Sequence, residues 1–399
     1  MSLSNKVKQF EYKKKNKQKL KAEEENVTNN RKSKYRIIKI TIYAIVAILV
    51  TIIVVLFSHT GGSVDMSVSS NKVGQTLTQF EDEFNHISFL MEKEQFKILQ
   101  LTDIHFGNGW WTKSKDKKAL TAVKTLIEET SPDIIIITGD VVYPMPIQTA
   151  TRNNMLQFEV FSKFMEGFEI PWTIVFGNHD AEAFATHTKK QIGEYLESLK
   201  FCFFKNNDIG ITGLGNNVIN IYNKDKTINN SLFLFDSGNT INNLQFLGYE
   251  KIADDQVEWY ENEVKRMGYP KSLAFMHVPQ LEYKIAWEKL REGSEEVKYH
   301  FGKAGEIGEK ISCAKEQSAL FDKMVELNST KGVFAGHDHL NDYSVSYKGI
   351  RLTFGKSIDY TAYLGISKKT DQRGGTLITI NKDSTFNISP IKLEEIANK

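Results

Sequence analysis

Residues 134–140 read IIIITGD, in which four isoleucines and a threonine are followed by Gly139 and Asp140. A short run of β-branched residues closed by turn residues is typical of a buried strand. Loops that leave a rigid sheet can bring their side chains to one point, so we expect the polar ends of such strands to converge at one edge of an α/β fold. Four other stretches have the same form, an apolar run that ends in Asp, Asn or His: FKILQLTDIH at 96–105, WTIVFGNHD at 172–180, LAFMH at 273–277 and VFAGHDH at 333–339.

The polar residues at these five strand ends are carboxylates, imidazoles and one side-chain amide, and none is a cysteine. This set of donors suits Zn, Mn or Fe, whereas thiolates would indicate a structural zinc or an iron–sulfur cluster. Two ions about 3.5–4 Å apart need a shared anionic ligand. Asp140 can bridge them, because Gly139 lets the backbone approach closely. We therefore expect two divalent or trivalent transition-metal ions (Fe, Mn or Zn).

The order D-x-H, G-D, G-N-H-D, H, G-H-x-H resembles the calcineurin-like metallophosphoesterase superfamily, over residues 97 to about 391. Within it, GDVVY at 139–143, FDSG at 235–238 and GHDHLND at 336–342 are similar to the purple-acid-phosphatase-like branch. The resemblance implies an α/β fold with a two-sheet β-sandwich flanked by helices. It places the metals at one end of the sandwich.

The resemblance also implies roles for single residues. His179 would face the substrate as the catalytic residue. Purple acid phosphatases proper have Gly where His105 stands and use the Tyr of G-D-x-x-Y as a metal ligand, so we expect Tyr143 to pack near the site instead. The implied ligands are Asp103, His105, Asp140 and His339 for one metal, and Asp140, Asn178, His277 and His337 for the other.

Four further residues are candidates for supporting roles. Asp180 and Asp338 lie inside the motifs, and we expect them to orient a neighbouring His through its other ring nitrogen. Their alternative is an exposed loop carboxylate. Trp110 and Trp111 follow the first ligand pair and are candidates for substrate binding, with core packing as the alternative.

Each motif taken alone has a structural explanation. Gly, Asn and Asp favour turns and helix caps, and a lone histidine after an apolar strand, such as His277, is commonly a core or capping residue. The presence of all five motifs in this order favours the metal site.

Residues 40–57 contain no charged residue, and a helix of this stretch with its flanks is long enough to cross a hydrocarbon core of about 30 Å. We expect a transmembrane helix over residues 37–57. A cleaved signal peptide is the alternative, but residues 58–61 (SHTG) form a poor cleavage site.

Charge predicts the orientation of this helix. Residues 1–39 contain 13 Lys and Arg against four Glu, a net charge of +9, within a whole-chain charge of +2. The positive-inside rule places the N-terminus in the cytoplasm and the rest of the chain outside the cell membrane. Few apolar residues occur in the arm at 1–36, so we expect it to be disordered.

The remaining chain divides into a polar linker at residues 58–92 and one catalytic domain at residues 93–399. No internal repeat splits this domain. Its two cysteines, Cys202 and Cys313, leave both a disulfide and free thiols open. Helical patterns at 115–129, 155–164, 189–199, 254–267 and 316–326 alternate with the strands, and short strands follow at 343–347, 351–354 and 376–380.

Together these features predict a membrane-anchored, outward-facing dinuclear-metal phosphoesterase. We expect a phosphomonoesterase that hydrolyses phosphate esters by metal-activated water. A phosphodiesterase on nucleotides or cell-envelope polymers is the alternative, because both reactions use the same metals. A non-catalytic surface binding module is a third interpretation, which the intact ligand set disfavours. The predicted partners are a phosphate ester and the lipid bilayer, with no specific nucleic acid.

Overall fold

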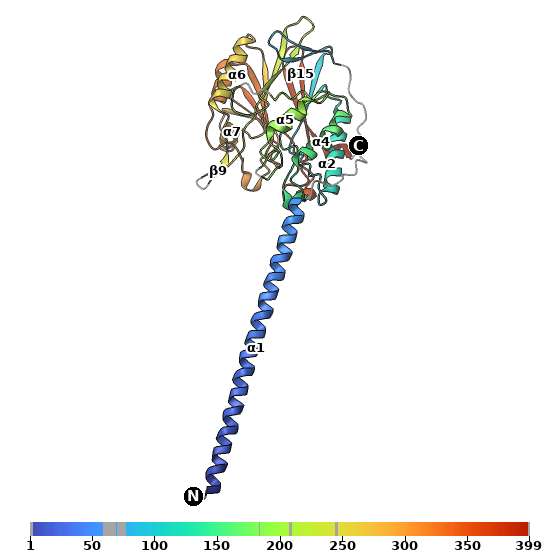
Figure 1. Cartoon of the computed structure of the whole chain (residues 1–399). Helices are drawn as coiled ribbons and strands as arrows, with labels where there is room; N and C mark the ends of the chain where they lie inside the picture. The colour runs from blue at the N-terminus through green and yellow to red at the C-terminus, as the bar shows by residue number, and fades with distance from the viewer. Residues whose placement is uncertain are drawn as a thin grey trace. The chain divides into compact units, whose positions relative to one another are not determined.

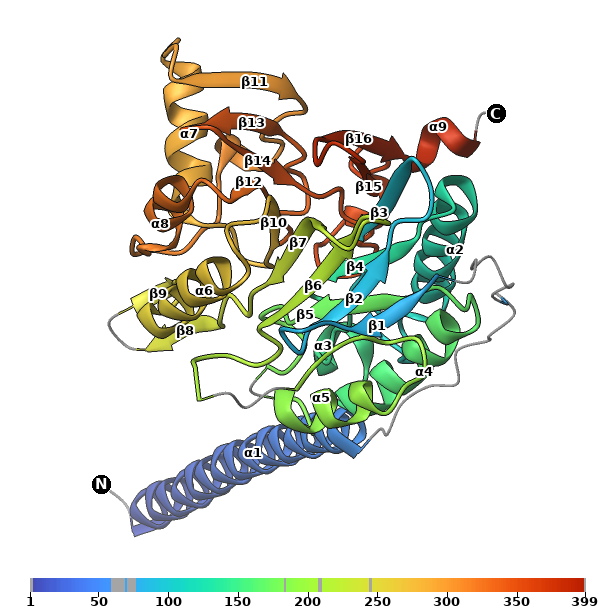
Figure 2. The same ribbon diagram turned by 90° about the horizontal axis from the view of Figure 1, so that it is seen from above.

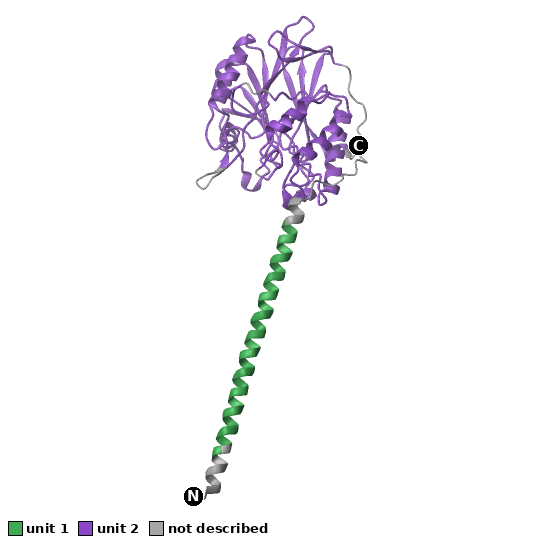
Figure 3. Ribbon diagram, viewed as in Figure 1, with its two compact units in different colours: residues 1–58 green, residues 59–399 purple. Residues whose placement is uncertain are grey.

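The computed structural model describes residues 3–58, 69, 77–182, 184–206, 210–243 and 246–397. The chain divides into two units, Met1–Ser58 and His59–Lys399 (Figure 3).

The first unit is a single helix, α1 (Leu3–Ser58), drawn without interruption in Figure 1. By length and composition, its segment Tyr12–Ile53 could cross a membrane, and its described side chains are exposed. The helix includes the basic arm, so the expectation of disorder at 1–36 is not met over the described residues. Lys, Gln, Glu and Ala are good helix formers, and extending an existing helix is easier than nucleating one.

The second unit contains two large sheets. The nine-stranded sheet has the order β1 (Gln79–Glu81), β2 (Ile87–Leu90), β6 (Asn217–Tyr222), β7 (Ile228–Leu234), β10 (Ser272–Phe275), β12 (Thr330–Ala335), β14 (Ile350–Phe354), β13 (Ser344–Tyr347), β11 (Val297–Phe301). The five-stranded sheet has the order β16 (Phe386–Lys392), β15 (Gly374–Asn381), β3 (Gln95–Leu101), β4 (Ile134–Thr138), β5 (Trp172–Val175). A separate hairpin joins β8 (Thr240–Asn243) to β9 (Phe246–Tyr249).

Strand β4 shows why the sheets pack face to face. Side chains alternate between the two faces of a strand. Ile134 and Ile136 belong to the apolar layer that both sheets share, whereas Ile135 and Ile137 join the core on the opposite face. All four are fully buried, as expected for a strand covered on both sides.

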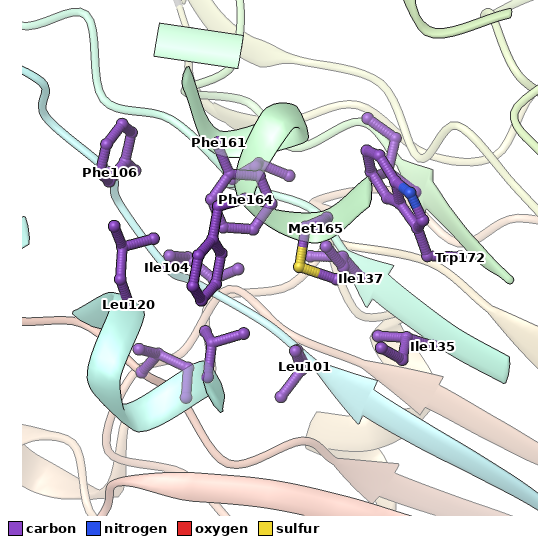
Figure 4. Packing of buried hydrophobic residues seen from close by; sticks show 14 of the residues in the cluster. Leu101, Ile104, Phe106, Leu120, Ile135, Ile137, Phe161, Phe164, Met165 and Trp172 are labelled. Atoms are coloured by element: carbon purple, nitrogen blue, oxygen red, sulfur yellow. The ribbon is translucent and has the colours of Figure 1, made fainter. Parts of the chain in front are cut away.

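Helices cover the outer faces (Figure 2). In the core beside the five-stranded sheet, Leu101 and Ile137 lie near Phe161, Phe164 and Met165 of α4 (Figure 4). One core contains residues of α2 (Lys113–Thr130), α4 (Asn154–Glu166) and α5 (Lys189–Glu197), and the other contains residues of α6 (Asp254–Arg266), α7 (Leu281–Arg291) and α8 (Leu320–Leu327). The short helices are α3 (Pro146–Thr149) and α9 (Leu393–Ala397). The predicted two-sheet sandwich flanked by helices is confirmed.

The topology brings the five motifs to one edge. Strands β3, β4 and β5 run parallel to one another, as do β7, β10, β12 and β14. Each motif begins within three residues of the carboxyl end of its strand: Asp103 after β3, Asp140 after β4, Asn178 after β5, His277 after β10 and His337 after β12.

The predicted linker is wrong in its last part. Strands β1 and β2 lie within residues 58–92, and β2 pairs in parallel with β6. Phe89 is fully buried between the sheets. Residues 87–90 are therefore a strand of the nine-stranded sheet and not part of a linker. Cys202 and Cys313 are free thiols.

Candidate metal centre

The backbone turns sharply at the metal-binding edge. Asp103, His105, Asp140 and His337 have positive φ angles of 51°, 50°, 51° and 78°. Such conformations are uncommon outside glycine, and they concentrate at functional sites, where the surrounding structure holds them in place. The left-handed turns let each chain segment leave its strand at once and direct its side chain across the sheet edge.

Glycines allow the segments to approach one another. A Cβ atom on Gly139 would lie 2.5 Å from Nδ1 of His277, and one on Gly177 would lie 2.1 Å from Oδ1 of Asp140. On Gly336 it would lie 1.9 Å from Oγ1 of Thr102. Each distance is far below van der Waals contact, so the glycines of the motifs are required by close packing.

The first cluster contains Asp103, His105, Asp140 and His339, all buried, with one ligand atom of each within 4.8 Å of the others. Nε2 of His105 lies 3.4 Å from Oδ2 of Asp140. Nε2 of His339 lies 3.4 Å from Oδ1 of Asp103. Two carboxylates and two imidazoles therefore face one point.

The second cluster contains Asp140, His277 and His337, also within 4.8 Å. Nε2 of His277 lies 3.1 Å from Oδ2 of Asp140 and 3.2 Å from Nδ1 of His337. The amide of Asn178 joins it, with Oδ1 3.1 Å from Nε2 of His277. Asp140 belongs to both clusters, as a bridging ligand must.

The donor atoms fit metal ions. Among the described residues, Oδ2 of Asp140 and both ring nitrogens of His105 are buried without a hydrogen-bond partner. Most buried polar atoms in folded proteins have a partner, although in this chain some others, such as Oε1 of Gln100, also have none. A cation at each cluster would satisfy Oδ2 of Asp140 and Nε2 of His105, and the buried His/Asp set is compatible with a dinuclear site.

The electrostatics of the ligands agree with cation binding. Burial raises the pKa of Asp140, but His277 and His179 outweigh it and hold the pKa well below its ordinary value. Burial lowers the pKa of His277, but Asp140 reverses this and raises it to about 9. Burial and the charge of His277 both lower the pKa of His337. The carboxylate thus attracts positive charge, which a metal ion would supply in place of the proton.

A further carboxylate, Asp359, stands behind the first cluster. Its Oδ2 lies 2.9 Å from Nδ1 of His339, and its Oδ1 lies 4.0 Å from Nδ1 of His105. Burial raises the pKa of Asp359, but His105 and His339 outweigh it and keep the carboxyl ionised. Sequence reasoning missed this residue. Its only signal is a polar residue a few positions after the apolar strand β14.

Asp180 and Asp338 act on the backbone and do not orient an imidazole as expected. Asp180 accepts hydrogen bonds from the N–H groups of Asp140, Val142 and Gly177. Asp338 accepts from the N–H of Ser312 and from the side chain of Asn341. Both are buried, so neither is an exposed loop carboxylate. Asp180 thus holds two ligand-bearing turns by their main chains, whereas Asp338 ties its own turn to the segment at Ser312.

His179 lies at the edge of the clusters. Its N–H donates to Oδ1 of Asp140, and its side chain is 25% exposed, whereas those of His105 and His277 are fully buried. Its Nδ1 lies 2.6 Å from Oε1 of Glu182. Glu182 is therefore the residue that orients this imidazole, and sequence reasoning missed it.

Aromatic rings surround the ligands. The ring of Tyr143 packs edge-on against His105 and His179, with centroids 5.0 and 5.1 Å apart. Tyr249 packs edge-on against His337 at 4.2 Å, and Tyr363 stacks on His339 at 4.5 Å. These rings limit the rotation of the imidazoles.

Trp110 and Trp111 are 66% and 55% exposed, which excludes core packing. Their contact with a substrate stays a prediction. A cavity of about 280 Å³ lies beside Asn178, lined also by Met145, Glu182 and Phe184. A second, of about 430 Å³, is lined by Tyr249, Asp236, Lys251 and Lys315, among others. The first cavity is lined by Asn178 itself, and the second by Tyr249, which packs on His337. A substrate therefore has room next to the second cluster.

The chain is similar to several known proteins. Residues 96–341 match the family described as calcineurin-like phosphoesterase. The chain is 27% identical over 302 residues to a protein from Arabidopsis thaliana named "Probable inactive purple acid phosphatase 28", covering 67% of this chain and 71% of that one. It is 27% identical over 272 residues to a phosphatase from Saccharomyces cerevisiae, covering 63% and 45%. A dimetal phosphatase from Danio rerio aligns with a TM-score of 0.49 and 11% identity over 75% of this chain and 96% of that one.

Proposed function

The chain belongs to the calcineurin-like phosphoesterase family of metal-dependent phosphoester hydrolases, and we propose that it is a phosphomonoesterase, anchored in the cell membrane, whose catalytic domain faces outward. The observation that carries the proposal is the position of Asp140 between two clusters of buried donors. The proposed ligands are the seven residues predicted above, and no position of the set is missing. The word "inactive" in the plant relative's name is said of that protein alone.

When bound, the two metal ions would activate a water molecule as the nucleophile and neutralise charge on the phosphoryl oxygens. We assign Asp103, His105, Asp140 and His339 to one ion and Asp140, Asn178, His277 and His337 to the other. Fe, Mn and Zn all suit these ligands.

The chain's own catalytic group is His179. Its partly exposed ring lies next to Asp140 without belonging to either cluster, so Nε2 is available to the leaving oxygen while Nδ1 is held by Glu182. A carboxylate at Nδ1 favours the protonated imidazole, which can donate its Nε2 proton to the leaving alkoxide. No covalent intermediate with the chain is needed.

The anchor assignment rests on α1, which is long and apolar enough to span a bilayer. The basic residues before the apolar stretch support a cytoplasmic N-terminus. Protease added to intact cells should then digest the catalytic domain and spare the N-terminal arm. Recovery of a soluble product that begins after residue 58 would show that the helix is a cleaved signal.

The test of the chemistry is turnover of a leaving-group series by the full-length protein in detergent, together with its metal content. His179→Asn should keep two metals per chain and lose roughly 10²–10⁴ in turnover of alkyl phosphates, the range of a general acid. The loss should shrink for nitrophenyl phosphate, whose leaving group needs no proton. His187→Asn is the matched control and should behave as wild type.

Two results would overturn this assignment: unchanged turnover in His179→Asn, or loss of a metal from that variant. A preference for bis-nitrophenyl phosphate over the monoester would favour the phosphodiesterase alternative. Metal-loaded protein that hydrolyses neither compound would favour a binding module.

A further inference from the structure

The exposed apolar side chains of the second unit are unevenly distributed. Ten large apolar side chains are exposed among its described residues, and six of them lie on the segments that leave the carboxyl ends of β3, β4, β5 and β14, at the edge that carries the clusters. A folded surface normally scatters such residues singly, and a concentration of them marks an interaction site. We call these six the apolar rim: Trp110, Trp111, Ile147, Phe184, Tyr363 and Leu364.

The loops of the apolar rim touch one another and the site. Gly109, next to Trp110, packs so closely on Thr149 of α3 that a Cβ atom would lie 1.5 Å from its carbonyl oxygen. The N–H of Thr186, two residues after Phe184, donates to the carbonyl of Arg152. Tyr363 stacks on the ligand candidate His339. The apolar rim therefore reaches the clusters at Tyr363, and at Phe184, which lines the cavity beside Asn178. The segments that carry Trp110 and Ile147 touch each other.

Lysines flank the two most apolar parts of the rim. Lys113, Lys117 and Lys118 follow Trp110 and Trp111, and all three are exposed. Lys368 and Lys369 follow Tyr363 and Leu364 and are exposed as well. Tryptophan and tyrosine favour the interface between water and hydrocarbon, and lysines beside them attract anionic headgroups. This combination is typical of a surface that inserts shallowly into a bilayer.

The proposed membrane anchor, α1, keeps the catalytic domain close to a bilayer. Helix α1 ends at Ser58, and 18 residues lie between it and Leu77. A chain of that length spans at most about 65 Å when fully extended, so the catalytic domain cannot leave the neighbourhood of the membrane. A surface held at this distance meets lipid at a high effective concentration.

We infer that the apolar rim docks on the bilayer that holds α1, and that the site therefore acts on phosphate esters carried by membrane-embedded molecules. The docking rests on the proposed anchoring of α1 in the membrane, and the substrate class rests on the proposed phosphomonoesterase activity. A phosphoryl group at headgroup level would reach the metal clusters without leaving the membrane. The lysines beside the rim would attract the anionic headgroups around that phosphoryl group.

Tryptophan fluorescence tests the docking directly. Trp110 is the first tryptophan of the chain, so α1 contributes no signal, and of the five only Trp110 and Trp111 are exposed. Full-length protein is reconstituted into vesicles of phosphatidylcholine and phosphatidylglycerol, with or without nitroxide-labelled phosphatidylcholine. Docking predicts quenching by the nitroxide lipid and protection from aqueous iodide. Quenching by iodide alone would overturn the inference and would favour a soluble partner for the rim.

Turnover tests the substrate class. In vesicles, Ile147→Ser/Leu364→Ser should lower kcat/KM for phosphatidic acid roughly tenfold or more, because two apolar side chains no longer enter the bilayer. Turnover of soluble 4-nitrophenyl phosphate should not change. Tyr269→Ser is the control, since this exposed residue precedes β10 at the opposite end of that strand from His277.

An equal effect on both compounds, or none on phosphatidic acid, would refute the substrate class. If the wild-type protein hydrolysed neither compound, the proposed function would fail, while the fluorescence experiment would still decide whether the rim docks.

Discussion

The two metal clusters share Asp140 but differ in the charge that surrounds them. The first cluster has two carboxylates, Asp103 and Asp140, and a third, Asp359, directly behind its imidazoles. The second has Asp140 alone. Nδ1 of its His277 faces the carbonyl oxygen of Thr138 at 2.8 Å, in place of a carboxylate. Anionic ligands bind cations more strongly, and a carboxylate behind an imidazole raises its basicity. We therefore expect the first cluster to hold its ion more tightly than the second.

The largest effect should come from the residue that the clusters share. Asp140→Asn removes the bridging charge, so both ions should be lost and activity should fall below detection. Elemental analysis of the purified full-length variant measures this. Asp225→Asn, on an exposed loop, is the control and should retain two metals. Retention of two metals by Asp140→Asn would refute the bridging role.

Removing the carboxylate behind the first cluster should reduce the difference in metal affinity between the two clusters. Asp359→Asn leaves all ligands in place but weakens the basicity of His339 and His105. The affinity of the first ion should fall roughly 10- to 100-fold, the usual cost of losing such a partner. Stepwise removal by a chelator should then release the two ions together, whereas the wild type should release them in two steps.

Asp338→Asn is the matched control for that experiment. Its carboxylate is equally buried and lies between His337 and His339 in sequence, yet it accepts from Ser312 and Asn341 and not from a ring nitrogen. It should leave the two-step release unchanged. An equal response of both variants would show that the effect is structural.

A substitution of Glu182 should have a smaller effect, on turnover and not on metal binding. Glu182→Gln keeps a hydrogen-bonding group near Nδ1 of His179 but removes the charge that favours the imidazolium. We expect turnover of alkyl phosphates to fall about tenfold and that of nitrophenyl phosphate to change little, with both metals retained. A merely structural role would lower both rates alike. Glu194→Gln, on the nearby helix α5, is the control.

Much of the fold and the site could be predicted because the signals are local. Runs such as IIIITGD predict strands directly, and the strands β3, β4, β5, β10 and β12 lie within two or three residues of their predicted positions. The spatial meeting of five motifs followed from one rule, that parallel strands present their carboxyl ends at the same edge. The left-handed turns at Asp103, His105 and Asp140 then direct the side chains across that edge.

What could not be predicted depends on tertiary contacts. Glu182 and Asp359 lie outside the motifs, and only the fold brings them to His179 and His339. Strand β2 was missed because a four-residue segment pairs with β6, more than a hundred residues away. Helix α7 was missed because Leu281–Arg291 mixes charged and buried positions. Its Tyr283 is fully buried and donates to the carbonyl of Val333.

The smallest effect concerns a buried carboxylate that accepts from a hydroxyl and a backbone N–H, whereas Asp359 faces an imidazole. Asp116 of α2 accepts hydrogen bonds from Thr112 and from the N–H of Gly107. Burial raises its pKa to about 7, well above the value of an exposed aspartate. The folded state therefore binds this proton more tightly than the unfolded chain does. Its contribution to stability is complete below about pH 4 and is lost as the pH rises to about 7.

Asp116→Asn should remove this dependence without touching the metals or turnover. Asn can still accept from Gly107, so the variant should match the wild type near pH 4. It should then gain roughly 1.4 kcal/mol over the wild type in free energy of unfolding for each pH unit up to about 7. Urea unfolding of the full-length chain in detergent at a series of pH values measures this difference in free energy of unfolding. For the control Asp225→Asn, the difference from the wild type should not change with pH above pH 5. A flat difference for Asp116→Asn too would show that the carboxyl of Asp116 has the same pKa in the folded and unfolded chains, and that burial does not raise it.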